Sequence, residues 1–342
     1  NGSSNNGYTN SPFYGCTSLK NIVLPERLTV IGRLAFGGLV SGRYGEKYIP
    51  PFESISLPST LKEIHEMAFL NARNLKTVTF ASGTTLSDAC DGKAFAIGKQ
   101  AFYYCTSLTE IALPTSSEAT YSIGDTAFAY TGLKEISIPK AVGWLGSGVF
   151  NRSSDLAKVV FEAGANPKCG TSLFAYTAVS GVTLPEGVEA ISDYMFQGCV
   201  NLTSVTVPAS VKSIGISAFE SCQALAKVTF ATYEKDGKSY SNLISIDNYA
   251  FSKTGITSFT FPTLEGTKTL DLGNSLFRSC MKLETVGLSE SVAEIGTAFA
   301  DCFSIRSFVV DENNENFSSK PGSPILYNAT GTAYMYICGQ LP

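Results

Sequence analysis

The chain has 342 residues, of which 44% are apolar and 16% are charged, and this composition excludes an intrinsically disordered protein. Its net charge of −4 comes from singly scattered residues, so no basic field would attract nucleic acid or an anionic membrane. No apolar run reaches the roughly 18 residues that a membrane-spanning helix needs, so we expect no transmembrane segment.

Residues 1–10, NGSSNNGYTN, begin the chain as a polar stretch that we interpret as a tether. This stretch does not have the pattern of a targeting signal, which combines basic residues with an apolar run. We therefore expect that any signal or lipid anchor lies upstream of this sequence.

Residues 11–310 repeat one short phrase around a phenylalanine that we call the anchor. The anchors are Phe13, Phe36, Phe69, Phe102, Phe128, Phe150, Phe174, Phe196, Phe219, Phe251, Phe277 and Phe299. The shortest intervals between them are 22 or 23 residues, and five intervals are lengthened by insertions. This period predicts a β-rich solenoid of about twelve stacked rungs, each rung being one repeat of the chain.

Each repeat predicts a short strand and two turns. Leu-x-x-Ile-x-Leu, as in 19–24, alternates apolar and polar residues over its last half, which indicates a strand with one buried face. A proline such as Pro25 ends it, because proline cannot donate to a strand ladder. Stacked strands predict a parallel sheet on one face, with irregular or short helical turns on the other. Four residues before the anchor, a glycine such as Gly98 or Gly170 is predicted to turn the chain with positive φ.

Insertions lengthen several repeats and offer candidate binding residues. Four of them follow the strand, at 81–96, 115–120, 231–242 and 263–269, so they are predicted to cluster along one rim. The third combines aromatic and charged side chains, which suits a protein contact. Its candidate residues are Tyr233, Glu234, Lys235, Asp236, Lys238 and Tyr240. A fifth insertion, before a strand, gives the secondary candidates Arg43, Tyr44, Lys47 and Tyr48.

The outward positions of the strands hold mostly small residues. Four consecutive ones are Thr183, Thr206, Thr229 and Thr260. This face has few aromatic or charged residues, so we expect the rim insertions to dominate any binding.

Cysteine and histidine give no catalytic or metal-binding motif. Six of the nine cysteines occupy one repeat slot after the anchor, where Thr131, Ser154 or Ala72 stands in other repeats. We therefore expect buried free thiols, although a bridge between Cys199 and Cys222 stays possible. His65, the only histidine, lies in the turn slot before Phe69 and is interpreted as a turn residue. No catalytic residue, cofactor or metal site is expected.

Residues 311–342 depart from the repeat. Their sequence predicts a hairpin whose turn spans 328–332, and such a segment would cap the apolar edge of the last rung.

The pattern I-G-x-x-A-F-x-x-C-x-x-L-x-x-I-x-L-P resembles the BspA-like leucine-rich repeat family over about residues 11–310. This resemblance implies a bacterial cell-surface or secreted protein, although mucosal protists also carry such repeats. It implies binding of host proteins such as fibronectin or fibrinogen, described for some members, and it supplies no catalytic residues.

Three functions follow from these observations. The first is a non-catalytic surface or secreted module for adhesion to host or matrix proteins. The second is a structural stalk that presents another domain. The third is a carbohydrate-active enzyme whose acidic residues the sequence does not place.

Overall fold

The computed structural model describes residues 12–13, 16, 18–38, 49–88, 95–115 and 120–335. The chain divides into two compact units, Asn1–Ala178 and Val179–Pro342, and each is built from stacked rungs of a β-solenoid. Together the two units hold about 11 turns, close to the twelve predicted. Within the described ranges every regular element is a strand, and the segments around the anchors are turns instead of the short helices allowed for in the prediction.

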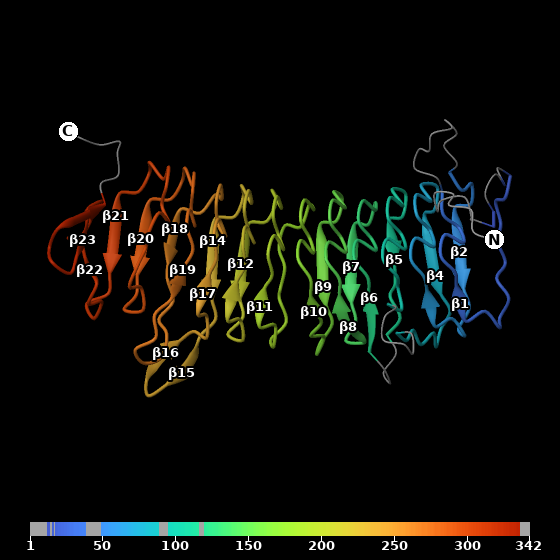
Figure 1. The fold of residues 1–342 in the computed structure, drawn as a ribbon, viewed down its shortest axis with the longest axis horizontal. Coiled ribbons are helices and arrows are strands. Elements are labelled where there is room, and N and C mark those ends of the chain that lie inside the picture. The colour runs from blue at the N-terminus through green and yellow to red at the C-terminus, as the bar shows by residue number, and fades with distance from the viewer. Residues whose placement is uncertain are drawn as a thin grey trace, which may run out of the picture. The chain divides into compact units, whose positions relative to one another are not determined.

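In the first unit, the predicted Leu-x-x-Ile-x-Leu strands form parallel ladders (Figure 1). One ladder joins β2 (Ser54–Leu57), β4 (Thr77–Phe80) and β5 (Glu110–Ile111), and another joins β7 (Glu135–Ile138) and β9 (Lys158–Phe161). Their side chains alternate between exposed and buried, as β7 shows with Glu135 and Ser137 outward and Ile136 and Ile138 inward. The predicted half-buried strand is therefore present.

A second series of shorter strands, which precede the anchors, also pairs in parallel. In the first unit it comprises β1 (Val30–Ile31), β3 (Glu63–Ile64), β6 (Tyr121–Ile123), β8 (Val142–Leu145) and β10 (Lys168–Cys169). Single bridges through Ile97 connect Ile64 with Ile123, so this series continues from rung to rung. The sequence predicted a sheet on one face only, and the structure adds this second, narrower ladder.

The second unit repeats both series. The longer strands are β12 (Ser204–Val207), β14 (Lys227–Phe230), β18 (Ser258–Thr260), β20 (Thr285–Leu288) and β21 (Ser307–Val310). The shorter ones are β11 (Ala190–Ile191), β13 (Ser213–Ile214), β17 (Ser245–Ile246) and β19 (Asp271–Leu272). An antiparallel hairpin, β15 (Tyr233–Lys235) and β16 (Lys238–Tyr240), projects from the body of this unit below β17 in the view (Figure 1).

The anchors form the core of each unit as a stack of nearly parallel rings. In the first unit, Phe69 lies 4.9 Å from Phe102 between ring centroids, with an interplanar angle of 4°. In the second, Phe219 lies 5.4 Å from Phe196 and 5.3 Å from Phe251. Since one ring recurs on each rung, the stack spaces the rungs and excludes water from the centre.

The glycines four residues before the anchors do not have positive φ, so their predicted role was wrong. For all of them except Gly32, the role is close packing against the preceding rung. A Cβ added at Gly170 would lie 2.6 Å from the backbone N of Ser147, and one at Gly273 would lie 2.3 Å from that of Asn248. His65 occupies the same slot without positive φ, and its Nε2 lies 3.0 Å from Oε2 of Glu63. This slot is small because the preceding rung passes directly beside it.

Left-handed geometry occurs instead on both sides of the anchor. Two residues before Phe102, Gln100 has φ 57°, and two residues after it, Tyr104 has φ 64°. The same pair of positive angles flanks nearly every other described anchor, including Phe219, with 51° at Ser217 and 63° at Ser221. The anchor thus lies between two reversals of the chain, and its ring is buried.

The end of the second unit confirms the predicted hairpin. Strands β22 (Phe317–Ser318), β23 (Leu326–Asn328) and β24 (Ala333–Met335) form an antiparallel sheet. Phe317 and Leu326 are buried, and the backbone N of Phe308 in β21 donates to the carbonyl of Ser323 at 3.0 Å. This segment therefore covers apolar side chains beside the last ladder.

Candidate interaction surfaces

The hairpin of the second unit brings the predicted candidate residues together. Tyr233 pairs with Tyr240 across the two strands, with ring centroids 6.1 Å apart, and Lys235 pairs with Lys238. Asp236 and Gly237 form the turn, with φ of 51° and 76°. An Asp-Gly pair with two positive φ angles is the two-residue turn that matches the twist of paired strands. The Asp-Gly pair therefore closes the insertion into a two-stranded β-hairpin.

Glu265, in the next post-strand insertion, fastens this hairpin. The hydroxyl of Tyr233 donates to Oε2 of Glu265 at 2.9 Å, and the ammonium of Lys235 pairs with Oε1 of the same carboxylate. The hydrogen bond to Glu265 raises the pKa of Tyr233 and of Lys235, and the bonds from Lys235 and Tyr233 lower the pKa of Glu265. At the base, the backbone N of Ser241 donates to the carbonyl of Thr263 at 2.8 Å. Two insertions are therefore joined into one surface, which we call the hairpin rim (231–242 and 263–269).

The remaining candidates have different surroundings. Glu234, Asp236 and Lys238 are exposed on the hairpin, and Glu234 accepts a hydrogen bond from the hydroxyl of Ser239. The secondary candidates Arg43, Tyr44, Lys47 and Tyr48 lie outside the described residues. In the first unit, the described part of the insertion at 81–96 is fastened by Asp88, whose carboxylate accepts from the backbone N of Ser122 at 2.7 Å.

The outward face of the longer strands carries a shallow hollow in the first unit. It has a volume of about 580 Å³ and is lined by β4, β5, β7 and β9. The small side chain of Ala112 lies in it, and Lys158 pairs with Glu135 at its edge at 3.2 Å. The lining lacks an exposed aromatic anchor of the kind that dominates protein interfaces.

Sequence reasoning missed a group of aromatic and basic side chains on the first unit. Tyr104, Tyr130 and Tyr176 each lie two residues after an anchor, at one of the left-handed positions. Tyr176 is 41% exposed, and Tyr104 and Tyr130 are half-buried. Aligning the repeats on their anchors and comparing the second residue after each one would have found this row.

None of the six slot cysteines forms a disulfide, and five of them are buried. The thiols of Cys105, Cys222 and Cys302 each donate to the carbonyl of the anchor on the preceding rung, at 3.2, 3.1 and 2.9 Å. Burial raises the pKa of Cys105 and of Cys222. Cys16, in the repeat of Phe13, is the exception and is exposed.

Two details of this slot need correction or extension. Ser153, not Ser154, takes the slot after Phe150, and its hydroxyl donates to the carbonyl of Phe128 at 2.9 Å. Thr131 also binds that carbonyl, at 2.9 Å. A hydroxyl and a thiol are interchangeable here because both are small donors. Cys199 and Cys222 form no disulfide, so the alternative bridge between them is absent.

No metal-binding constellation occurs in the part of the chain that the structure describes, judged by groups of three or more His, Cys, Asp or Glu side chains. His65, the only histidine in the sequence, contacts the carboxylate of Glu63. Among the same described residues, we find no helix with the length and apolarity that crossing a membrane requires.

A family model described as "BspA type Leucine rich repeat region (6 copies)" matches residues 4–43, 46–95, 90–199, 167–241 and 189–321. Among solved structures, a leucine-rich repeat protein from Bacteroides ovatus is similar, with 24% identity and a TM-score of 0.61. The match covers 84% of this chain, which spans 65% of that protein.

Two further structures show weaker likeness. A leucine-rich cell surface protein from Faecalibacterium prausnitzii has 21% identity and a TM-score of 0.43, with 83% of this chain and 87% of that chain covered. The pneumococcal vaccine antigen PcpA has 15% identity and a TM-score of 0.44, with coverage of 84% and 75%. No curated protein matches the chain by sequence.

Proposed function

Because the chain belongs to the BspA-type leucine-rich repeat family, we propose that it is a non-catalytic module that binds a host or matrix protein at the cell surface or outside the cell. Leucine-rich repeat proteins generally bind proteins, which supports the class of partner. The surface location follows from the same family. The observation that carries the proposal is the hairpin rim.

The hairpin rim has the composition and the rigidity of a binding surface. Tyr233 and Tyr240 supply aromatic area, and Lys235, Asp236 and Lys238 supply charges that orient a partner. Glu265 holds both Tyr233 and Lys235 before any partner arrives. A surface ordered in advance loses less conformational entropy on binding, so it binds more tightly than a loop that must first order itself.

Surface plasmon resonance against immobilised fibronectin and fibrinogen tests this function. We expect saturable binding that weakens at least tenfold when residues 232–241 are replaced by a short Gly/Ser link. Tyr240→Ala should weaken binding, whereas the matched change Ser239→Ala on the same strand should leave it within twofold.

A different result would contradict the assignment of binding to the hairpin rim. If the link variant binds normally while larger residues at Thr183, Thr206 and Thr229 abolish binding, the partner lies on the strand face. Absence of saturable binding to any matrix or cell-surface protein supports the alternative function of a stalk.

A further inference from the structure

In the first unit, the turns that follow the anchors carry a row of tyrosine and arginine side chains; we call this part of each rung the anchor corner. We call the row itself the tyrosine–arginine row, and its members are Arg73, Tyr103, Tyr104, Tyr130, Arg152 and Tyr176. Four of these residues, Tyr104, Tyr130, Arg152 and Tyr176, have φ between 57° and 64°. Bulky side chains rarely adopt this geometry, whereas Gly, Asn and Ser do so at lower energy. Ser221 and Ser279 have the same geometry at this repeat position, so it is the large side chains that distinguish the row.

The rings of the row pack on one another. Tyr104 and Tyr130 are stacked, with centroids 4.5 Å apart and an interplanar angle of 8°. The ring of Tyr103 meets both edge-on, at 5.0 and 5.4 Å. Stacking covers one face of each of these two rings and holds them in a fixed arrangement.

Two guanidinium groups lie along the row, each over a tyrosine. The Cζ atom of Arg73 is 5.4 Å from the centroid of Tyr104, and that of Arg152 is 4.5 Å from the centroid of Tyr176. Arg73 also donates through Nε to the amide oxygen of Asn71 at 2.6 Å. Among the described residues, neither arginine forms an ion pair.

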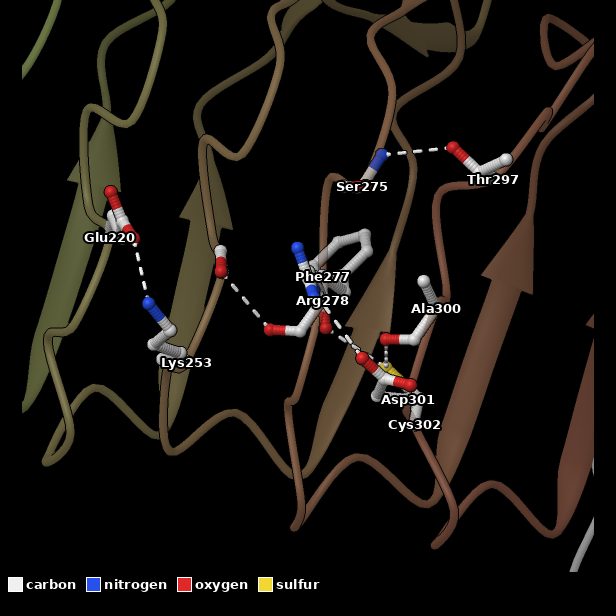
Figure 2. A network of polar contacts seen from close by, with 10 residues as sticks. Glu220, Lys253, Ser275, Phe277, Arg278, Thr297, Ala300, Asp301 and Cys302 are labelled. Carbon is white, nitrogen blue, oxygen red and sulfur yellow. Dashed lines mark hydrogen bonds and ion pairs between the residues drawn. The ribbon is translucent and has the colours of Figure 1, made fainter.

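The equivalent corner of the second unit is built differently. Lys253 stands two residues after its anchor, as Arg152 does, and it pairs with Glu220 at 3.1 Å (Figure 2). On the following rungs, Arg278 pairs with Asp301 at 3.3 Å (Figure 2). Although burial acts to raise the pKa of Glu220, hydrogen bonds from Lys253 and Gln197 lower it. Lys253 and Arg278 therefore have acidic partners, whereas Arg73 and Arg152 have none within the part of the chain that the structure describes.

We propose that the tyrosine–arginine row is a second binding surface, which takes an extended acidic segment of a protein partner. A guanidinium binds a carboxylate through two parallel hydrogen bonds, and tyrosine and arginine are the residues most enriched at the energetic centres of protein interfaces. The rungs of Arg73 and Arg152 are three apart, and the anchors between them are spaced by 4.9, 5.0 and 5.8 Å. An extended chain rises about 3.3 Å per residue, so acidic residues four or five positions apart reach both arginines.

A sulfated carbohydrate fits this row less well. Such a polyanion is attracted by a dense field of lysine and arginine, and here two cations are separated by tyrosines on a chain with net charge −4. Because the whole chain is negatively charged, it does not attract an acidic peptide at long range. Binding of such a peptide therefore depends on direct contacts with the row.

Fluorescence anisotropy with a labelled deca-glutamate peptide at low ionic strength tests the proposal. We expect saturable binding that Arg73→Ala and Arg152→Ala each weaken about tenfold, and that added salt weakens further. Lys253→Ala is the matched control, because it removes a cation at the same repeat position and should change the affinity less than twofold. Arg152→Lys keeps the charge without the planar fork and should weaken binding by a smaller factor. Because Arg73 donates to buried Asn71 and Lys253 pairs with Glu220, thermal melts check that each variant is folded at the assay temperature.

The proposal is overturned if deca-glutamate does not bind, or if Lys253→Ala weakens binding as much as Arg152→Ala. It is also overturned if a heparin-derived oligosaccharide binds more tightly than the peptide and loses its affinity with the same arginines, because the ligand is then a carbohydrate. The Gly/Ser link at 232–241 should leave peptide binding unchanged. Failure of the hairpin rim and failure of this row are therefore distinguished.

Discussion

Truncation of one anchor should destabilise the second unit strongly and locally. Phe219 is fully buried and stacks on Phe196 and Phe251, so Phe219→Ala removes the ring from the middle of the column. Burial of a Phe side chain contributes about 1.5–3 kcal/mol, and the cavity left behind adds to the loss because neighbouring rungs are fixed by their backbone ladders. We expect the free energy of unfolding to fall by about 3–5 kcal/mol.

Urea denaturation followed by circular dichroism measures this loss, and hydrogen exchange locates it. In a stacked architecture each rung contacts only its neighbours, so amide protection should fall most between residues 196 and 251. Phe303→Ala is the matched control, because Phe303 is 55% exposed and its loss should change stability by less than about 0.5 kcal/mol. Uniform loss of protection over the whole unit, or a loss near zero, would refute the nearest-neighbour reasoning.

Three further predictions follow from the described contacts. Gly170→Ala should destabilise by about 1–3 kcal/mol in thermal melts, because its Cβ would overlap backbone of the preceding rung. Gly32→Ala, which meets no atom within 4 Å and has no positive φ, should be neutral or slightly stabilising; equal losses in the two variants would contradict the close-packing role. In native protein, a thiol reagent should modify Cys16 rapidly and the buried slot cysteines only after denaturation, and rapid native modification of the latter would show that the slot is open. The pKa of Glu265 is depressed in the folded state, so its contribution is present at neutral pH and is lost as pH falls below the ordinary value of 4.5 and through the lower folded value. Protection factors of the hairpin amides, taken relative to intrinsic exchange at each pH, should therefore fall in that acid range, and Glu265→Gln should abolish this pH dependence.

The repeat and its anchor were predictable because they depend on local pattern. A phenylalanine recurs every 22 or 23 residues where no insertion intervenes, and this recurrence specifies the column of stacked rings. Apolar, often β-branched residues alternate with polar ones after it, and this alternation specifies the longer strands. The role of the small residue before the anchor was not predictable from its type. Glycine serves both for positive φ and for close approach, and only the position of the preceding rung, 2.6 Å from a Cβ at Gly170, distinguishes the two.

The two candidate surfaces also differ in how far the sequence predicts them. The hairpin rim could be found as an insertion rich in tyrosine and charge, and its Asp-Gly turn was readable in the sequence. Its fastening by Glu265 was not, because the partner lies 32 residues beyond Tyr233. The tyrosine–arginine row is spread over separate repeats, where each residue alone resembles ordinary surface variation. Stacking brings Tyr104 within 4.5 Å of Tyr130 and makes the row one surface.

The hydrogen bond to the preceding anchor carbonyl, which Cys105, Cys222, Cys302 and Ser153 share, has a consequence for how such a chain changes in length. The donor is a thiol at Cys105 and Cys222 and a hydroxyl at Ser153, and the acceptor is always backbone. A whole repeat can therefore be duplicated or deleted by recombination within the gene, and the new neighbours still meet a small donor and a free carbonyl. A deletion of part of a repeat takes the preceding carbonyl out of reach, and a buried donor left without a partner costs about 1–3 kcal/mol. Lineages that carry this architecture should consequently differ from one another by multiples of one coil.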